Sequence, residues 1–382
     1  MSVFRLVESL LSFSLQVTII IAITAVAARR LQRNQDRDCL WNLCFLTLLV
    51  VPLIGFTFPH LRLINTSATL RLPEQTPAGS MLSSFAAGLV ALWGAGTALL
   101  IGLLARDAFI LISLLCRSVP LPAEFDYALR VRVSGSGLSE RDAGTRNLGR
   151  KPIRILLSDR VRTACCFQLQ TPTILIPRAL LSMPCDDLVY VIRHEVAHLR
   201  FGHPLRFFVQ RCAESIFWFH PAVWWASRQA VLTREFVCDE AAVSSKAEAA
   251  RYLRALLQLI ISPAAKGPSG ALGIGNHRGL LADRAESLSR HQWSRQNNPL
   301  QRNAWIAVAG SVAMVAVLTL WIPIGNSMSF RSPWSPWPAA TAVFLHAAGI
   351  PARDYEVDGH RFRPQELTPY DSRNRRSSPT PD

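Results

Sequence analysis

Four stretches without a charged residue constrain the fold of this chain most strongly. They cover residues 9–28, 39–58, 81–105 and 304–324. Each is apolar and about as long as the roughly 20 residues that a helix needs to cross a bilayer. Half of the residues are hydrophobic and the mean hydropathy is +0.21, which is high for a soluble protein. We therefore expect a multi-pass α-helical membrane protein with four spans.

The first stretch has a second interpretation, because Ala25 and Ala27 are typical of a signal-peptide cleavage site. A signal peptide carries its positive charge before the apolar run. Here Arg5 and Glu8 cancel before the run, and the arginines follow it. This order favours a span that is retained in the protein.

Basic residues beside the runs predict the orientation, because short loops rich in Lys and Arg stay in the cytoplasm. Between the first two runs, ten positions hold four arginines, whereas residues 59–80 hold two. Four arginines lie just before the fourth run, at Arg284, Arg290, Arg295 and Arg302, whereas the twenty residues after it hold only Arg331. We expect a protein of the inner (cytoplasmic) membrane with its N-terminus outside.

This orientation predicts the domains. Residues 1–105 hold three membrane spans, residues 106–303 form a cytoplasmic domain, and residues 304–324 form the fourth span. Residues 108–116 are expected to form a helix that leaves the membrane along its surface. A short extracytoplasmic tail follows over residues 325–382, with an ordered piece at 339–362 and a disordered, polar end at 371–382.

The net charge of +15 is carried almost wholly by arginine, much of it beside the spans, where it would meet lipid headgroups. No helix-turn-helix or zinc-finger spacing accompanies it, so we expect no direct binding of nucleic acid. The eight cysteines fall in or beside the spans or in the cytoplasmic segment, where structural disulfides are not expected. The sequence contains no CxxC pair, so a metal site made of cysteines is not expected.

Residues 194–198 read His-Glu-Val-Ala-His. On a helix, His194 and His198 lie one turn apart on the same face, so both imidazoles can bind one Zn²⁺. Glu195 is then placed to take a proton from a water that the metal activates. A five-residue pattern with two free positions also arises by chance, so the motif needs a third ligand to support it.

Downstream, Glu235 and Asp239 are four residues apart and would share one face of a helix. Glu235 is the candidate third metal ligand, and Asp239 would accept a hydrogen bond from a ligating imidazole, His194 being the best placed. Alternatively, the two carboxylates are ordinary surface charges that pair with Arg234 or Arg251. Combined with the histidine motif, the spacing favours a metallopeptidase site.

The surrounding sequence predicts a mainly helical α+β domain. Two short strands are expected at 153–157 and 173–176, the second offering an edge with which a substrate strand could pair. A helix at 244–261 and a flexible loop at 263–275 follow. Before them, just after the expected helix that carries the histidines, an aromatic segment contains Phe207, Phe208, Phe217, Trp218, Phe219, Trp224 and Trp225. It reads as helical core packing, with a membrane-facing surface as the alternative.

These features together resemble the BlaR/MecR family of integral-membrane zinc metallopeptidases. The resemblance rests on the spans, HEVAH at 194, the segment ending His220-Pro-Ala-Val-Trp-Trp225, Glu235 with Asp239, and Thr173-Ile-Leu-Ile-Pro177. It covers roughly residues 1–325. It implies a gluzincin-type cytoplasmic domain that holds one zinc ion through His194, His198 and Glu235, with Glu195 as general base. In such proteins an external signal activates cleavage of a cytoplasmic repressor, of winged-helix type.

Two positions and the C-terminal region depart from that family. Members often have Asp where His203 stands and Asn where His220 stands. If one helix continued from His194, His203 would be two and a half turns away and on the wrong face for the same ion, so we expect a structural role. His220 is either a packed core residue or a group beside the metal ligands. Residues 325–382 contain no lysine and are too few for the family's penicillin-binding sensor with its S-x-x-K motif, so covalent β-lactam sensing is not expected.

Three functions therefore compete. The first is a signalling membrane metallopeptidase that cuts one cytoplasmic protein. The second is a general quality-control or CAAX-type membrane zinc protease, which shares both motifs and would cut many substrates. The third is a non-catalytic membrane receptor or scaffold, against which the intact Glu195 argues. No feature of the sequence indicates an oligomeric state.

Overall fold

The computed structural model describes the following residues: 3–59, 61–62, 77–122, 125, 153–161, 163–168, 171–261, 277–291, 310, 312–313, 316–317, 320–321, 337–350, 356–357 and 360–361. The chain forms two compact units. The first contains Met1–Ile23, Thr47–Ala95 and Ala309–Asp382, and the second contains Thr24–Leu46 and Gly96–Val308.

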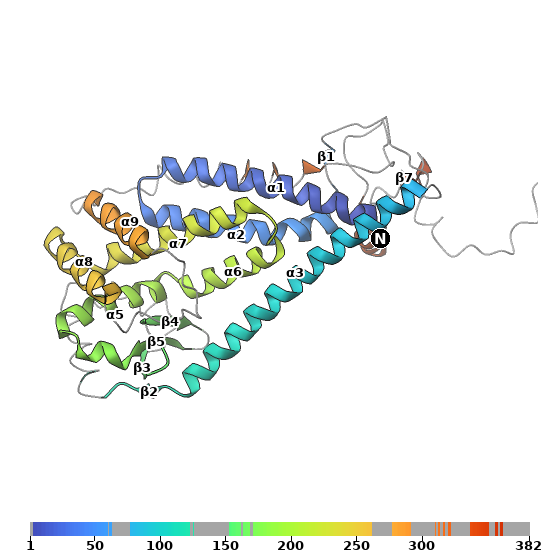
Figure 1. Ribbon diagram of the computed structural model, residues 1–382. Helices are drawn as coiled ribbons and strands as arrows, with labels where there is room; N and C mark the ends of the chain where they lie inside the picture. The colour runs from blue at the N-terminus through green and yellow to red at the C-terminus, as the bar shows by residue number, and fades with distance from the viewer. Residues whose placement is uncertain are drawn as a thin grey trace, which may run out of the picture. The chain divides into compact units, whose positions relative to one another are not determined.

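Three long apolar helices begin the chain: α1 (Val3–Arg30), α2 (Asn34–Thr57) and α3 (Pro77–Cys116) (Figure 1). Each contains a segment long and apolar enough to cross a membrane, at Ser9–Arg30, Asn34–Thr57 and Ser84–Cys116. These helices contain the first three predicted runs. Residues 108–116 are helical, as expected, and continue α3 without a break to Cys116; their path along the membrane surface stays a prediction. Most of the fourth predicted span, 304–324, lies outside the described residues, so that span stays a prediction.

In the first unit, α1 and α2 pack through Phe13, whose ring meets Phe56 edge-on at 5.6 Å between centroids. Short β-pairs accompany them: β1 (Leu61–Arg62) runs parallel to β6 (Leu320–Trp321), and β7 (Glu356–Val357) pairs antiparallel with β8 (His360–Arg361). Helix α11 spans Ala339–Ala347. The ordered piece expected in the tail is thus confirmed in part, and the polar end at 371–382 lies outside the described residues.

A four-stranded sheet underlies the second unit, in the order β2-β3-β5-β4. The strands are β2 (Val119–Pro120), β3 (Arg154–Ser158), β4 (Cys165–Gln168) and β5 (Pro172–Pro177). β3 and β5 run parallel, and the outer two strands are antiparallel to their neighbours. The expectation that β5 offers an edge to a substrate was wrong, because β5 pairs on both sides. Fully buried residues of β5, Ile174 to Ile176, suit this central position.

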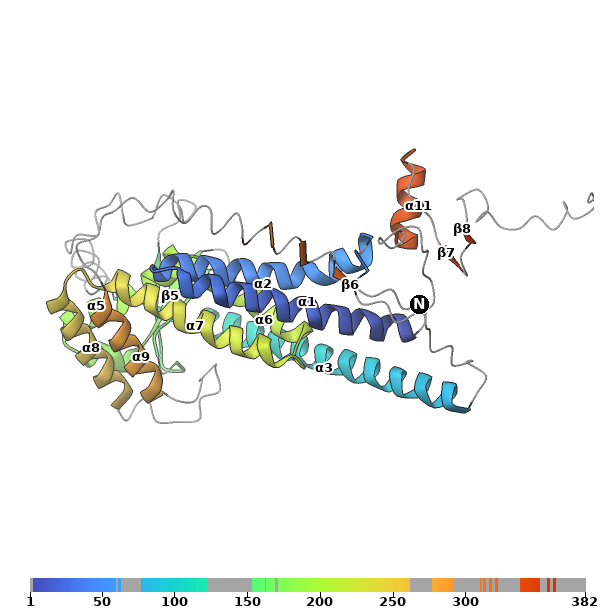
Figure 2. The same ribbon diagram turned by 90° about the horizontal axis from the view of Figure 1, so that it is seen from above.

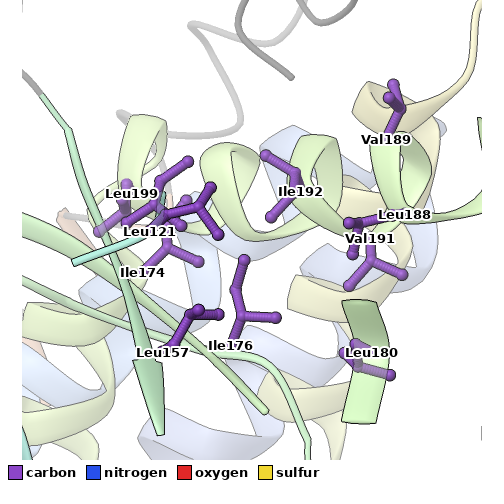
Figure 3. Close-up of a cluster of buried hydrophobic side chains, with 11 residues drawn as sticks. Leu121, Leu157, Ile174, Ile176, Leu180, Leu188, Val189, Val191, Ile192 and Leu199 are labelled. Atoms are coloured by element: carbon purple, nitrogen blue, oxygen red, sulfur yellow. The ribbon is translucent and has the colours of Figure 1, made fainter. Parts of the chain in front are cut away.

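The sheet supports helix α5 (Cys185–Arg200), which carries the histidine motif. Asp186 and Asp187 occupy the first turn, where carboxylates stabilise a helix N-terminus. The apolar side of α5 packs on β3 and β5, as Figure 3 shows. The cluster includes Leu188, Ile192 and Leu199 of the helix and Ile174 and Ile176 of the sheet. Each such side chain contributes roughly 1.5–3 kcal/mol by burial, which holds α5 against the sheet.

Among its described residues, the second unit also contains α6 (His203–Ile216), α7 (Pro221–Ala242), α8 (Lys246–Ile261) and α9 (His277–Arg290). Between α5 and α6, Gly202 takes a positive φ of 68°, which ends α5 and changes the direction of the chain. The helix expected at 244–261 is confirmed as α8. The loop expected at 263–275 lies outside the described residues.

Candidate metal site

His194 and His198 of α5 meet Glu235 of α7. The two imidazole Nε2 atoms are 3.1 Å apart. The Glu235 carboxylate lies 3.5 Å from Nε2 of His194 and 3.6 Å from Nε2 of His198. All three residues are at least partly buried and offer ligand atoms within 4.8 Å of one another. The structure thus brings together the three residues that the sequence indicated as metal ligands.

These separations fit a tetrahedral ion. Ligand atoms bound at about 2.0–2.1 Å with tetrahedral angles lie about 3.3–3.4 Å from each other. The Nε2 atoms are 3.1 Å apart, and the shortest distances to the carboxylate, 3.5 Å from His194 to Oε2 and 3.6 Å from His198 to Oε1, lie close to that value. Two imidazoles and one carboxylate are also the donor set of one class of catalytic zinc site, which leaves a fourth position open.

Protonation of these groups reflects their burial and mutual charge. Burial opposes ionisation of His194, but hydrogen bonds with Asp239 and Glu235 raise its pKa to about 9. For His198, burial and the neighbouring positive His194 lower the pKa to about 3. Glu235 is held ionised against burial by His194 and Arg284, which lower its pKa. This group of residues therefore has a negative carboxylate beside two imidazoles, a donor set that suits a cation.

Glu195 lies on the same helix and is 8% exposed. Burial raises the pKa of its carboxyl group, and the negative Glu235 raises it further. The group is also hydrogen-bonded to the thiol of Cys166 on the edge strand β4. A raised pKa brings a carboxylate closer to the value that a general base needs near neutral pH.

Asp239 is fully buried and contacts His194 from the side away from Glu235, with its Oδ1 3.2 Å from Nδ1. Tyr252 of α8 donates to Asp239 at 2.6 Å, and its hydroxyl lies 3.0 Å from the same Nδ1. The position of Asp239 is therefore as the sequence indicated. The alternative, a surface charge paired with Arg234 or Arg251, is contradicted by its 0% exposure.

Arg284 of α9 supplies the charge that balances these carboxylates. Its Nε donates to Asp239 at 2.7 Å, and a terminal nitrogen lies 3.4 Å from the Glu235 carboxylate. The sequence indicated Arg284 only as a membrane-flanking charge, and Tyr252 only as part of an amphipathic helix. Neither residue has a spacing motif, because each comes from a separate helix that meets the site through tertiary packing.

His203 does not lie on the helix that carries the motif. Since Gly202 ends that helix, the prediction from helical phase was wrong in its premise, and His203 begins α6. Its Nδ1 lies 3.0 Å from Nδ1 of His198, and its Nε2 lies 3.4 Å from the carboxylate of Asp38 on α2. His198 thus directs Nε2 to the candidate metal position and Nδ1 to His203.

His203, His198 and Cys238 also form a second group of potential ligand atoms. Burial raises the pKa of the Cys238 thiol well above its ordinary value, so the thiolate that a metal needs is disfavoured. If Nε2 of His198 is a ligand, its Nδ1 carries the proton and donates to His203. His203 is therefore best described as orienting His198. His220 is buried at the start of α7, outside both groups among the described residues, consistent with core packing.

Comparison with known proteins agrees with this geometry. A family model described as BlaR1 peptidase M56 matches residues 6–286, which include most of α1, all of α2 and α3, and every residue of the candidate site. None of the curated proteins compared with the chain matches it.

Proposed function

The chain belongs to the BlaR1 peptidase M56 family, and from this premise we propose that it is a membrane zinc metalloendopeptidase. Its substrate would be a cytoplasmic protein, a transcriptional repressor in signal transduction. The clustering of three potential ligands carries the proposal, because His194, His198 and Glu235 offer two imidazoles and a carboxylate within 4.8 Å of one another. A bound zinc ion would lower the pKa of water and polarise the scissile carbonyl.

The residues of the chain divide the remaining work. Glu195 takes the proton from the attacking water and delivers it to the leaving amine. Asp239 and His203 each face the Nδ1 of one ligating histidine, which fixes the tautomer and the direction of both Nε2 atoms. Arg284 keeps Asp239 and Glu235 ionised.

Strand β4 is the better candidate for substrate pairing, in place of β5. It lies at the edge of the sheet, packs beside α5, and carries Cys166, which contacts the general base. A substrate strand added to this edge would gain main-chain hydrogen bonds without sequence selectivity. The selectivity for one protein would then come from contacts elsewhere.

The test compares cells that carry the wild type, Glu195→Gln or Glu286→Gln by proteomics. Glu286 is a matched control because its side chain is 57% exposed on α9. We expect one cytoplasmic protein to be cut in the wild type and in the control, and intact with Glu195→Gln. Many cut membrane proteins would instead indicate the quality-control or CAAX-type protease. Zinc bound without any cleavage would indicate a non-catalytic receptor or scaffold.

A further inference from the structure

The α6–α7 hairpin is unusually apolar for a segment so close to a catalytic site. Between Arg211 and Arg228 the sequence has a single charged residue, Glu214. That carboxylate is 2% exposed and accepts hydrogen bonds from Gln210, Arg211 and Ser227. The hairpin therefore presents no charge along these 16 positions, while large apolar side chains are exposed on it.

The tip of the hairpin packs against membrane helix α3. A Cβ atom added at Gly96 would lie 2.5 Å from the indole of Trp218, so the absence of a side chain there admits the tryptophan. The first charged residue from Gly96 toward the end of α3 is Arg106, ten residues away. Ten helical residues span about 15 Å, half of a hydrocarbon core of about 30 Å. Trp218 thus contacts α3 near the middle of its apolar run.

Helix α2 gives a second, independent measure of depth. Asp38, just before the apolar run of α2, forms an ion pair with Arg206 of α6. From Arg206, α6 continues for ten residues to Ile216, again about 15 Å. Between these levels, Trp41 of α2 meets Trp225 edge-on at 5.8 Å between ring centroids. The distances from the charged ends of α2 and α3 therefore both place the tip of the hairpin about 15 Å into the apolar layer.

Several polar groups at the tip are hydrogen-bonded within the hairpin, which the membrane interior favours. The Phe217 N–H donates to Ala213 at 3.0 Å, and the His220 N–H donates to Phe217 at 2.9 Å. Pro221 has no N–H to satisfy. The indole of Trp224 donates to the carbonyl of Trp218 at 2.7 Å. Two antiparallel helices joined in this way (Figure 2) can enter lipid without an open backbone group at these positions.

We propose that the α6–α7 hairpin enters the bilayer from the side of the metal site, as a re-entrant hairpin in contact with lipid acyl chains. Its exposed face provides the lipid contact: Phe208 is 51% exposed, Phe219 39%, Trp224 38% and Trp225 41%. This inference concerns the seating of the domain and does not depend on catalysis. Membrane insertion thus reconciles the two interpretations of the aromatic segment, since Phe217 is core and its neighbours face outward.

The test uses the full chain in lipid nanodiscs with Phe219→Cys and, as control, Leu257→Cys. Leu257 on α8 is 44% exposed, a fraction similar to the 39% of Phe219, but it lies outside the hairpin. Reaction of each cysteine with a water-soluble maleimide is followed by peptide mass spectrometry, which separates it from the native cysteines. We expect the cysteine of Phe219→Cys to react at least about tenfold more slowly than that of Leu257→Cys. Lipid surroundings raise the pKa of a thiol, and a rise of one unit removes about nine-tenths of the reactive thiolate. Equal rates in the two variants would overturn the proposal.

A second measurement needs no substitution and remains valid if a variant misfolds. Phospholipids with a diazirine in the acyl chain are photolysed with the wild type. Adducts should form on the peptide that contains Phe219 and Trp224, and not on the peptide that contains Leu257. Protection from maleimide without lipid adducts would mean that protein, such as a second copy of the chain, covers the hairpin, and the proposal would fail.

Discussion

Replacing His203 with leucine tests how the site orients its metal ligands. When Nε2 of His198 binds the metal, its Nδ1–H donates a hydrogen bond over 3.0 Å to Nδ1 of His203, a residue that is 2% exposed. Leucine has a similar size but no acceptor, so a buried N–H on the ligand would lose its partner, at a cost of about 1–3 kcal/mol. Loss of a residue that hydrogen-bonds a metal ligand weakens metal binding about 10–100-fold, which corresponds to about 1.4–2.8 kcal/mol. This range agrees with the cost of the unpaired N–H.

Chelator competition on the purified full chain measures the zinc dissociation constant, and the visible absorption of the Co²⁺ form reports ligand geometry. Asparagine is the matched control, because its side-chain oxygen can take the place of the imidazole acceptor. We expect His203→Leu to weaken zinc binding within the stated range and to alter the Co²⁺ spectrum, while His203→Asn stays near the wild type. A leucine variant with wild-type affinity and spectrum would refute the orienting role.

Three other predictions follow from the same site. Glu195→Gln should lower cleavage by about 10²–10⁴-fold and keep zinc binding, and equal loss of both would contradict a general-base role. Because the pKa of His194 is about 9 before a metal binds, zinc at pH 7 must displace its proton. Apparent affinity should therefore fall about tenfold per pH unit below 9, with release of about one proton per ion from His194, measured by calorimetry in two buffers. Arg284→Ala should destabilise the second unit by about 3–5 kcal/mol, since Asp239 loses its partner while fully buried. Chemical unfolding measures this, and a change below about 1 kcal/mol would contradict it.

Sequence patterns predicted the features that depend on local order. The apolar runs of α1 to α3 and the i, i+4 pair His194 and His198 are properties of one helix, so period and length reveal them. Glu235 and Asp239 were also found by helical spacing. The metal-ligand set could therefore be assembled from two local motifs, although nothing in their spacing showed that the two helices would meet.

Features that depend on long-range pairing were missed. The order of strands placed β4, not β5, at the edge, and strand order follows from contacts that a single strand does not encode. Arg284 and Tyr252 approach the site from separate helices. For His203 a local signal did exist, because Gly202 commonly ends a helix by taking positive φ. The prediction for His203 failed because it counted helical turns from His194 through Gly202, where the helix ends.

The ties between α2 and the metal site matter for anyone who wishes to produce the catalytic part alone. A fragment cut at residues 106–303 would remove Asp38 and Asn34, which belong to the same compact unit as the site. Arg206 and His203 would lose the carboxylate that they face, and Glu240 would lose the amide that donates to it at 2.7 Å. The start of α2 is thus part of the compact unit that contains the candidate site. Removing it would expose residues that are buried or ion-paired in the full chain.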